Sequence, residues 1–581
     1  MGRGYKISSL WIQSSLPLNP RTRRIERAAL AATPNEMQRF GRGDPAPLLP
    51  EPQRSSSSSA RSPRLHARTP FAYRLCETAT ELLIYFLLVF TPWAFGTTQS
   101  WSIWTLNVGG YLLGFLLAAK WFICWLTGFK PARWVDASSV GALHLEERPA
   151  WRGRLIVRGL ALLTVLILAY TFLSAANRRA TFNPAKEHHD YFDPIMWLPH
   201  SYDSARTWDA FWSYLALALA FWSVRDWLEG KTRRERLQTA EAEARRGADT
   251  ASAPASTPPH YPEPPKVHAH EFPERLKRLL WVLCINGALV AFEGILQRLD
   301  GTPKLLWLVQ PRYTDSEGLF GPYAYRANAA SYLNLIWPVC LGFWFVLRRS
   351  SVRHHLSGGR IGGGSYVVLL PLAVLTAAAP IISTSRGGAL VCIVSILAAT
   401  GLLFWISRRE KSWTRAGMLS LFVVILVFAG SLGWRDLAIR LEEIFVDQLS
   451  GRTEIYQNSQ ELARESGVLG TGPATFRSLY QLFQQPKQEW AAYLHDDWLE
   501  TRITFGWIGF GLILLALILA ATRWFVSTGV YAPSELVAFI WLAMAGALVH
   551  AKFDFPFQIH SIVFLFLVFC AILACVGRRE H

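Results

Sequence analysis

Two polar motifs interrupt long apolar stretches in the C-terminal half of the chain, and both carry side chains suited to chemistry on phosphate or hydroxyl groups. The first is Ser383–Gly388, in which Arg386 has no acidic neighbour in the sequence to neutralise its charge. An unpaired charge at a membrane boundary is expensive, so such a residue usually has a function. The second is Tyr493–Glu500, which brings His495 and three acids to the start of another apolar run. Together the motifs predict chemistry at a membrane surface.

A third polar motif, Gly318–Asn328, precedes an earlier apolar run and contains Arg326 and Asn328. A single arginine at a membrane boundary is as often a snorkelling residue as a functional one. A single histidine such as His495 is more often a surface or capping residue than a catalytic one. Three such motifs on one side of the membrane, each beside an apolar run, favour a shared site that contains Arg326, Arg386 and His495.

The composition is that of a membrane protein with several spanning helices. Of 581 residues, 51% are hydrophobic and 25 are Trp. Apolar windows of about 20 residues, the length that crosses about 30 Å of hydrocarbon, predict an all-α polytopic fold with about twelve transmembrane helices. The windows are 81–96, 103–126, 155–175, 208–224, 279–296, 329–347, 366–382, 389–406, 418–433, 505–521, 535–550 and 561–576.

Basic residues crowd alternate loops, and this distribution predicts the topology. The formal net charge of +17 would suggest a nucleic-acid partner in a soluble protein. Here Lys and Arg concentrate in loops that the positive-inside rule assigns to the cytoplasm, so no nucleic-acid partner is expected. The rule places both termini inside and the three polar motifs outside.

The windows and charges divide the chain into four regions. Residues 1–75 form a disordered basic cytoplasmic tail that could attract anionic membrane lipids. Residues 76–227 hold the N-terminal membrane helices with an outer loop at 177–207, and residues 228–277 form a cytoplasmic linker. Residues 278–577 form a second membrane domain, which includes a large helical outer segment, 434–504, between the ninth and tenth helices.

The cysteines give no sign of a disulfide or a metal site. All seven lie in or beside apolar runs, and no CxxC or Cys/His metal spacing occurs. Neither disulfides nor a metal cofactor is therefore predicted.

In its polar motifs the chain resembles the O-antigen ligase and O-antigen polymerase superfamily, the membrane glycosyltransferases of lipopolysaccharide and surface polysaccharide assembly. The motifs that carry the resemblance are Ser383–Gly388, Gly451-Arg452, Gly470–Phe476, His495 with Asp497 to Glu500, and Gly506. Asp496 stands where the family usually has an asparagine. A late cluster with His550, Asp554, Phe555 and Pro556 also resembles the family's last outer turn. The resemblance covers roughly residues 280 to 560.

The resemblance implies a reaction at the periplasmic face of the bacterial inner membrane. A glycan attached to a polyprenyl pyrophosphate, such as undecaprenyl pyrophosphate, would be transferred to a hydroxyl acceptor such as lipid A core or another glycan. No nucleotide, metal or other cofactor is expected, because two arginines can neutralise the pyrophosphate.

Each candidate residue has an expected role in that transfer. Arg326 and Arg386, with Arg452 as a third, would stabilise the charge that develops on the departing pyrophosphate, since a guanidinium stays protonated and offers forked donors. His495 would accept the proton of the acceptor hydroxyl near neutral pH. Glu500, about one helical turn away, would replace or orient it. The other expected substrate-binding residues are Ser385, Asn328, Asp497 and Trp498.

Several alternatives remain open. A polymerase that extends the glycan shares the same leaving-group chemistry. A polysaccharide transporter would place charges near the bilayer midplane and often show inverted repeats, and a non-catalytic scaffold would use the outer segment to bind partners. Locally, Asp496 and Asp497 could instead bind a divalent ion. The outer loop with His188-His189-Asp190 could cover the site, contact the acceptor or hold a metal.

Overall fold

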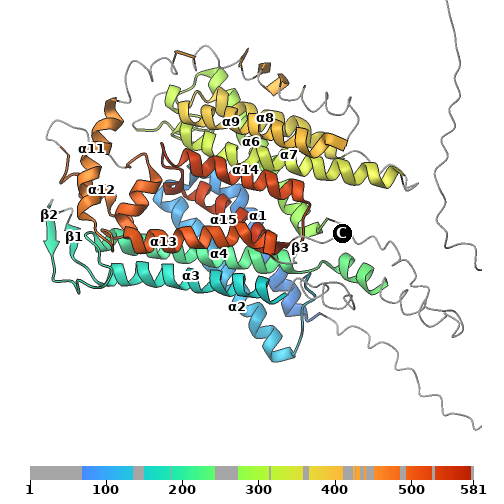
Figure 1. Cartoon of the computed structure of the whole chain (residues 1–581), viewed down its shortest axis with the longest axis horizontal. Helices are drawn as coiled ribbons and strands as arrows, with labels where there is room; N and C mark the ends of the chain where they lie inside the picture. Colours follow the sequence, from blue (N-terminus) through green and yellow to red (C-terminus); the bar gives the residue numbers. More distant parts are fainter. Residues whose placement is uncertain are drawn as a thin grey trace, which may run out of the picture. The chain divides into compact units, whose positions relative to one another are not determined.

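The computed structural model is a bundle of helices (Figure 1). It describes residues 69–134, 150–241 except 184 and 187, 272–312, 316–356, 365–409, 450–484, 493–526 and 530–577, with scattered residues between 420 and 439. Most of the predicted tail, residues 1–68, lies outside these ranges. Helix α1 (Phe71–Trp93) nevertheless begins inside the region predicted as tail, because Tyr73 is buried and packs on Phe129 with ring centroids 5.1 Å apart.

Among the described helices, seven are long and apolar enough to span a membrane. They are α1, α2 (Ser100–Thr127), α3 (Ala150–Ala176), α6 (Glu274–Asp300), α7 (Arg326–Leu356), α9 (Arg386–Ile406) and α13 (Asp497–Val526). Packed among them are α4 (Ser204–Glu229) and three shorter apolar helices, α8 (Leu369–Ile382), α14 (Ser534–His550) and α15 (His560–Cys575) (Figure 1). The prediction of a helical multi-pass membrane protein is therefore confirmed.

The predicted windows fall on these helices with one exception. Most of window 418–433 lies outside the described residues, so the count of about twelve spans stays a prediction. Within the predicted outer segment 434–504, α11 (Ser450–Glu465) and α12 (Phe476–Tyr480) are helical. Within the predicted linker 228–277, residues 233–241 are helical and residues 242–271 lie outside the described ranges.

The few strands are short. In the loop between α3 and α4, β1 (Ala180–Asn183) pairs antiparallel with β2 (His188–Tyr191), so that Phe182 lies opposite His189. Near the C-terminus, β3 (Val530–Tyr531) pairs in parallel with β4 (Val576–Gly577).

Helix α7 forms the centre of the bundle. Of its apolar window, 94% is buried, whereas the figure for α3 is 22%. The backbone of α7 approaches α14 closely at Gly342, where an added Cβ would lie 2.8 Å from Cβ of Phe539. The high burial of α7 identifies it as the core helix, while α3 has a surface composition suited to contact with lipid.

The outer segment is joined to α13 by backbone contacts between glycines. Gly470 and Gly506 both have positive φ, and a Cβ on Gly470 would lie 2.3 Å from the Gly506 nitrogen. The amides of residues 471 and 472 donate to the carbonyls of Ile503 and Thr504 at 3.0 and 2.9 Å. Side chains would prevent this approach, so glycine at positions 470 and 506 has a packing reason.

The bundle has two polar ends. At the first, which we call the Asp226 end, α1 and α6 begin and α2 and α4 finish. At the second, which we call the His495 end, α7, α9 and α13 begin and α14 finishes.

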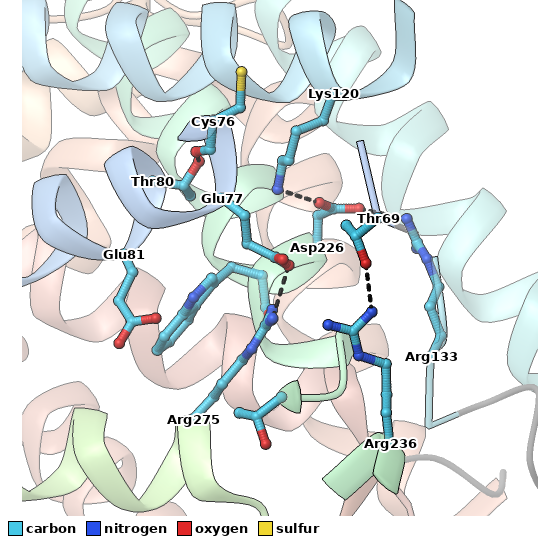
Figure 2. Close-up of polar contacts among 12 residues, drawn as sticks. Thr69, Cys76, Glu77, Thr80, Glu81, Lys120, Arg133, Asp226, Arg236 and Arg275 are labelled. Atoms are coloured by element: carbon cyan, nitrogen blue, oxygen red, sulfur yellow. Dashed lines mark hydrogen bonds and ion pairs between the residues drawn. The ribbon is translucent and has the colours of Figure 1, made fainter. Parts of the chain in front are cut away.

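Buried ion pairs connect four helices at the Asp226 end (Figure 2). Asp226 of α4 accepts hydrogen bonds from Lys120 of α2 and from Arg133, each at 2.6 Å. Arg275 of α6 donates to Glu77 of α1 at 2.7 Å. The Lys120 side chain is 2% exposed, and a charge that deeply buried requires a partner. The cluster therefore fixes the relative positions of helices from both halves of the chain.

We expect Asp226→Asn to lower the free energy of unfolding by about 3–5 kcal/mol, because it leaves Lys120 buried without a carboxylate. Adding Lys120→Met should recover much of that loss. Thermal unfolding of the detergent-solubilised full-length protein measures both effects. Arg278→Ala is the control, since Arg278 is 45% exposed and its pair with Glu81 should contribute less than about 1 kcal/mol. A loss for Asp226→Asn no larger than for the control would contradict the expectation.

Candidate functional site

Three segments that are far apart in the sequence meet at the His495 end. They are the 383–386 turn between α8 and α9, residues 493–497 at the start of α13, and the 551–559 turn between α14 and α15. His495 Nδ1 lies 3.2 Å from Asp554 Oδ1, and its ring stands edge-on to Phe555 at a centroid distance of 4.8 Å. On the other side, a Cβ on Gly387 would lie 3.1 Å from the ring of Phe553 in this turn and 3.0 Å from His550 Nε2 just before it. The first turn of α9 and His495 therefore pack against the same turn.

Backbone contacts hold His495 in an unusual conformation. Its φ is +58°, a state that costs a non-glycine residue about 1–3 kcal/mol and persists only where the surroundings impose it. Its carbonyl accepts a hydrogen bond from the Tyr456 hydroxyl of α11 at 3.0 Å. Two residues later, the Asp497 amide donates to the Ala551 carbonyl at 2.8 Å, and the Asp497 carboxylate accepts from the Phe557 amide at 2.7 Å. The start of α13 is thus fixed on the 551–559 turn.

Asp554 is the buried acceptor at the centre of the site. Its Oδ2 lies 3.5 Å from the Tyr325 hydroxyl and 3.9 Å from His550 Nε2. Burial alone would raise the pKa of Asp554. The hydrogen bond from His495 and the charges of His550, His495 and Arg452 lower it by more than burial raises it, so the pKa lies below its ordinary value. An ionised carboxylate only accepts hydrogen bonds. His495 Nδ1 must therefore donate, which leaves the lone pair on Nε2.

Two arginines converge on the 383–386 turn from other helices. Arg326 at the start of α7 donates to the Glu317 carbonyl at 2.7 Å and lies 3.4 Å from Thr384 Oγ1. Arg298 near the end of α6 reaches the same two groups at 3.2 and 3.1 Å. Thr384 is fully buried with φ +56°. Two guanidinium groups therefore lie side by side at this turn.

The other two predicted arginines lie at the same end. Arg386 is the first residue of α9, two positions after Thr384, and is half-buried. Arg452 of α11 donates to the Phe553 carbonyl in the 551–559 turn at 2.7 Å. Arg326 thus contacts the turn that contains Arg386, while Arg452 contacts the turn that contains Asp554. The structure places all three predicted arginines and His495 at the same end of the bundle.

Three predicted substrate-binding residues have structural contacts. The Ser385 hydroxyl accepts a hydrogen bond from the Gly388 amide at 3.2 Å and so caps α9. The Trp498 indole donates to the Leu548 carbonyl at 2.9 Å. Asn328 is 5% exposed in the first turn of α7. Ser385 and Trp498 therefore contribute to holding helices of the site in place, while Asn328 is buried beside Arg326.

Glu500 does not contact the His495 ring. It is buried and accepts a hydrogen bond from the Leu494 amide at 3.1 Å. Among the described residues, the carboxylate at the ring is that of Asp554. Glu500 therefore positions the backbone beside His495, whereas Asp554 orients its imidazole.

The adjacent acids Asp496 and Asp497 have different partners. Asp496 forms an ion pair with Lys552, while Asp497 accepts from the backbone of Phe557. Within the described ranges, no group of three or more His, Cys, Asp or Glu residues is arranged to hold a metal ion.

Sequence reasoning did not select Arg298 or Asp554 as site residues. Arg298 lies near the end of an apolar helix, where an arginine has the appearance of an ordinary snorkelling residue. Asp554 did belong to a recognised cluster, but its role depends on the path of the 551–559 turn. The aromatic stack of Tyr325, Phe555 and Tyr493, with centroids 5.4 and 4.4 Å apart, likewise required the structure.

An apolar cavity of about 360 Å³ lies beside the start of α13. Helices α3, α4, α13 and α15 line it, and its wall includes Tyr214, Phe505 and Phe566. Asp497 and Glu500 also line it. A hydrocarbon-sized space therefore adjoins the helix start that carries the candidate histidine.

A comparison with known protein families matches a segment that contains part of this site. Residues 371–514 match the family model described as O-antigen ligase. The matched region contains Arg386, Arg452 and His495. No curated protein matches the chain. The predicted resemblance is confirmed, and with the apolar helices it indicates a multi-pass protein of the bacterial inner membrane. Residues 371–514 therefore form a domain of the O-antigen ligase superfamily.

Proposed function

We propose that this protein transfers a glycan from a polyprenyl pyrophosphate, such as undecaprenyl pyrophosphate, to a hydroxyl of lipid A core at the periplasmic face of the inner membrane. The observation that carries the proposal is the gathering of an imidazole–carboxylate pair and three predicted arginines at one end of the bundle. In the reaction, the bond between the sugar anomeric carbon and the pyrophosphate oxygen breaks. A bond between that carbon and the acceptor oxygen forms.

The arginines suit the leaving group. As the sugar bond breaks, negative charge grows on the pyrophosphate, and cations already in place stabilise that transition state more than the ground state. Arg326 and Arg386 are the proposed phosphate-binding pair, since Arg326 reaches the turn that precedes Arg386. Arg298 adds a further positive charge at the same threonine. Arg452 extends the charge toward Asp554.

His495 suits the acceptor. When the Nδ1–H group of the neutral imidazole donates a hydrogen bond to Asp554, the lone pair on Nε2 can accept the proton of the attacking hydroxyl. The imidazolium that results is stabilised by the Asp554 carboxylate beside it. The His495 side chain is 23% exposed, which leaves it accessible to an acceptor.

The lipid carrier and the topology have separate support. The apolar cavity of about 360 Å³ offers space for part of a hydrocarbon chain. The described residues at the edges of the basic loops, such as Arg133, Arg225 and Arg275, lie at the Asp226 end. The positive-inside rule then assigns that end and both termini to the cytoplasm. The His495 end then faces the periplasm, where lipid-linked glycans present their sugars.

Substitution of the proposed catalytic groups tests the transfer itself. We expect Arg386→Ala and His495→Ala each to reduce transfer by about 100-fold or more. Arg386→Ala removes a cation that stabilises the departing pyrophosphate, and His495→Ala removes the base. Arg386→Lys should recover only part of the activity, since lysine lacks the forked donors. The measurement is transfer from purified lipid-linked glycan by each full-length variant. Arg278→Ala, at the Asp226 end, is the matched arginine control. Full activity in both alanine variants would exclude the proposal.

The Asp554 carboxylate gives a pH-dependent prediction. Its pKa in the folded protein lies below the ordinary value of 3.8, so its ionised form stabilises the fold above that pH. The stabilisation disappears as the pH falls through the lowered pKa. Asp554→Asn should therefore be less stable than the unaltered protein at pH 7, and the gap should narrow below pH 3.8. Thermal unfolding across this range measures it. A difference in stability between the two proteins that stays the same at every pH would contradict this prediction.

Deletion of the gene distinguishes a ligase from a polymerase, which uses the same leaving-group chemistry. For a ligase, long glycan chains should accumulate on the polyprenyl carrier, because their transfer to the acceptor is blocked. For a polymerase, single repeat units should appear on the acceptor. Gel separation of lipopolysaccharide together with analysis of the carrier-linked pool gives the readout. The second pattern would replace the ligase assignment by the polymerase one.

A further inference from the structure

A second cavity, of about 120 Å³, lies between the β1–β2 hairpin and helices α11 and α12. Its aromatic and polar lining consists of His189, Tyr191, Tyr202, Phe483, Glu465, Ser466 and Thr471. None of the candidate catalytic residues contributes to it. The cavity joins the predicted outer loop 177–207 to residues 462–483 of the outer segment, and the proposed transfer assigns no task to the residues that line it.

His189 brings an unsatisfied polar atom to this cavity. Strand alternation turns His189 inward, where it is 8% exposed and packs on Phe182 at a ring distance of 5.2 Å. Among the described residues, its Nε2 has no hydrogen-bond partner. Leaving such a group buried and unpaired costs roughly 1–3 kcal/mol. A ligand that enters the cavity would supply the missing partner.

The neighbouring histidine makes a natural control. His188 faces the opposite side of the strand, is 54% exposed, and lies 3.2 Å from Asp190. Because consecutive strand residues point to opposite faces, His188 and His189 cannot share one metal ion. The open possibility of a metal site on these two histidines is therefore not supported by the hairpin.

We propose that this cavity binds one neutral sugar ring of the glycan. Aromatic side chains can cover the apolar C–H face of a pyranose, while its hydroxyl groups need hydrogen-bonding partners. His189 Nε2 is one partner, and the Ser466 hydroxyl, which donates to the Ala463 carbonyl at 2.9 Å, keeps its lone pairs as acceptors. The carboxylate of Glu465 accepts from hydroxyl groups and repels phosphate. This chemistry selects sugar over pyrophosphate.

The position of the cavity suits a ring that is not itself reacting. Helix α11 contacts the His495 carbonyl through Tyr456 and lines the cavity at Glu465. From residue 456 to residue 465 the helix rises by roughly 14 Å at 1.5 Å per residue. A glycan with its reactive end at His495 can therefore place a later ring in the cavity. In this respect the inference deepens the proposed function and rests on it.

Sugar binding by the full-length protein in detergent tests the inference. The probes are free glucose, galactose and N-acetylglucosamine, observed by saturation-transfer difference NMR. We expect His189→Ala to reduce the saturation transfer to at least one of these sugars about five-fold or more, and His188→Ala to leave it unchanged. Tyr191→Ala is a second variant at a position that is 71% exposed, so it spares the fold. It should weaken the same signal.

Two outcomes of the NMR experiment would contradict sugar binding in this cavity. Absence of any sugar signal on the unaltered protein would overturn the proposal, as would signals from the His189→Ala and Tyr191→Ala proteins equal to that of His188→Ala. Transfer assays then distinguish the source of the ring. A KM for donor that rises in His189→Ala, with the KM for acceptor unchanged, assigns the ring to the donor glycan. The reverse pattern assigns it to the acceptor.

Failure of this inference is separable from failure of the proposed function. Arg386→Ala should lose transfer yet keep the sugar signal that depends on His189. If Arg386→Ala keeps full transfer while His189→Ala loses sugar binding, the transfer mechanism is wrong and the binding site stands. If Arg386→Ala loses transfer while His189→Ala binds sugar normally, the mechanism stands and the binding site is wrong.

Discussion

The attachment of the start of α13 to the 551–559 turn is the contact on which the candidate site depends. Asp497 makes it twice, through its amide to Ala551 and through its carboxylate to Phe557. His495 lies two residues before Asp497 and Asp554 lies within the turn, so this attachment determines their separation. The positive φ of His495 is tolerated for the same reason. A histidine on a freely moving loop would not hold one tautomer toward one acid.

The membrane environment explains why the polar groups gather at the two ends of the bundle. Charges cannot remain unpaired within hydrocarbon, and the described ion pairs and arginines occur where helices begin or finish. At the Asp226 end, acids and bases neutralise one another, as Lys120 and Asp226 do. At the His495 end, Arg298 and Arg326 both contact the Thr384 hydroxyl and the Glu317 carbonyl. Paired charges therefore join helices at the Asp226 end, while the His495 end combines ion pairs, such as that of Lys552 with Asp496, with several arginines close together.

The sequence predicted the helices well because long apolar runs have few other solutions in a membrane. It also predicted that Arg326, Arg386 and His495 lie at one end, since the alternation of loops alone determines the side. It could not predict which acid forms the hydrogen bond with the His495 ring. Glu500 is one turn from His495 only if the helix already includes His495, yet α13 begins at Asp497 and the φ of His495 turns its ring away. Side-chain direction at a helix start depends on tertiary contacts that composition does not record.

The site also extends beyond the segment that matches the O-antigen ligase family. Residues 371–514 contain Arg386 and His495, but Arg326 precedes this segment and Asp554 follows it. The apolar cavity needs α3 and α4 from the N-terminal region, and the smaller cavity needs the hairpin at 180–191. A histidine without Asp554 would lack a fixed tautomer, and in the proposed transfer Arg386 without Arg326 would present less positive charge to a pyrophosphate. The unit that would perform the proposed transfer is therefore the helical bundle as a whole, in which the N-terminal region supplies part of the walls of both cavities.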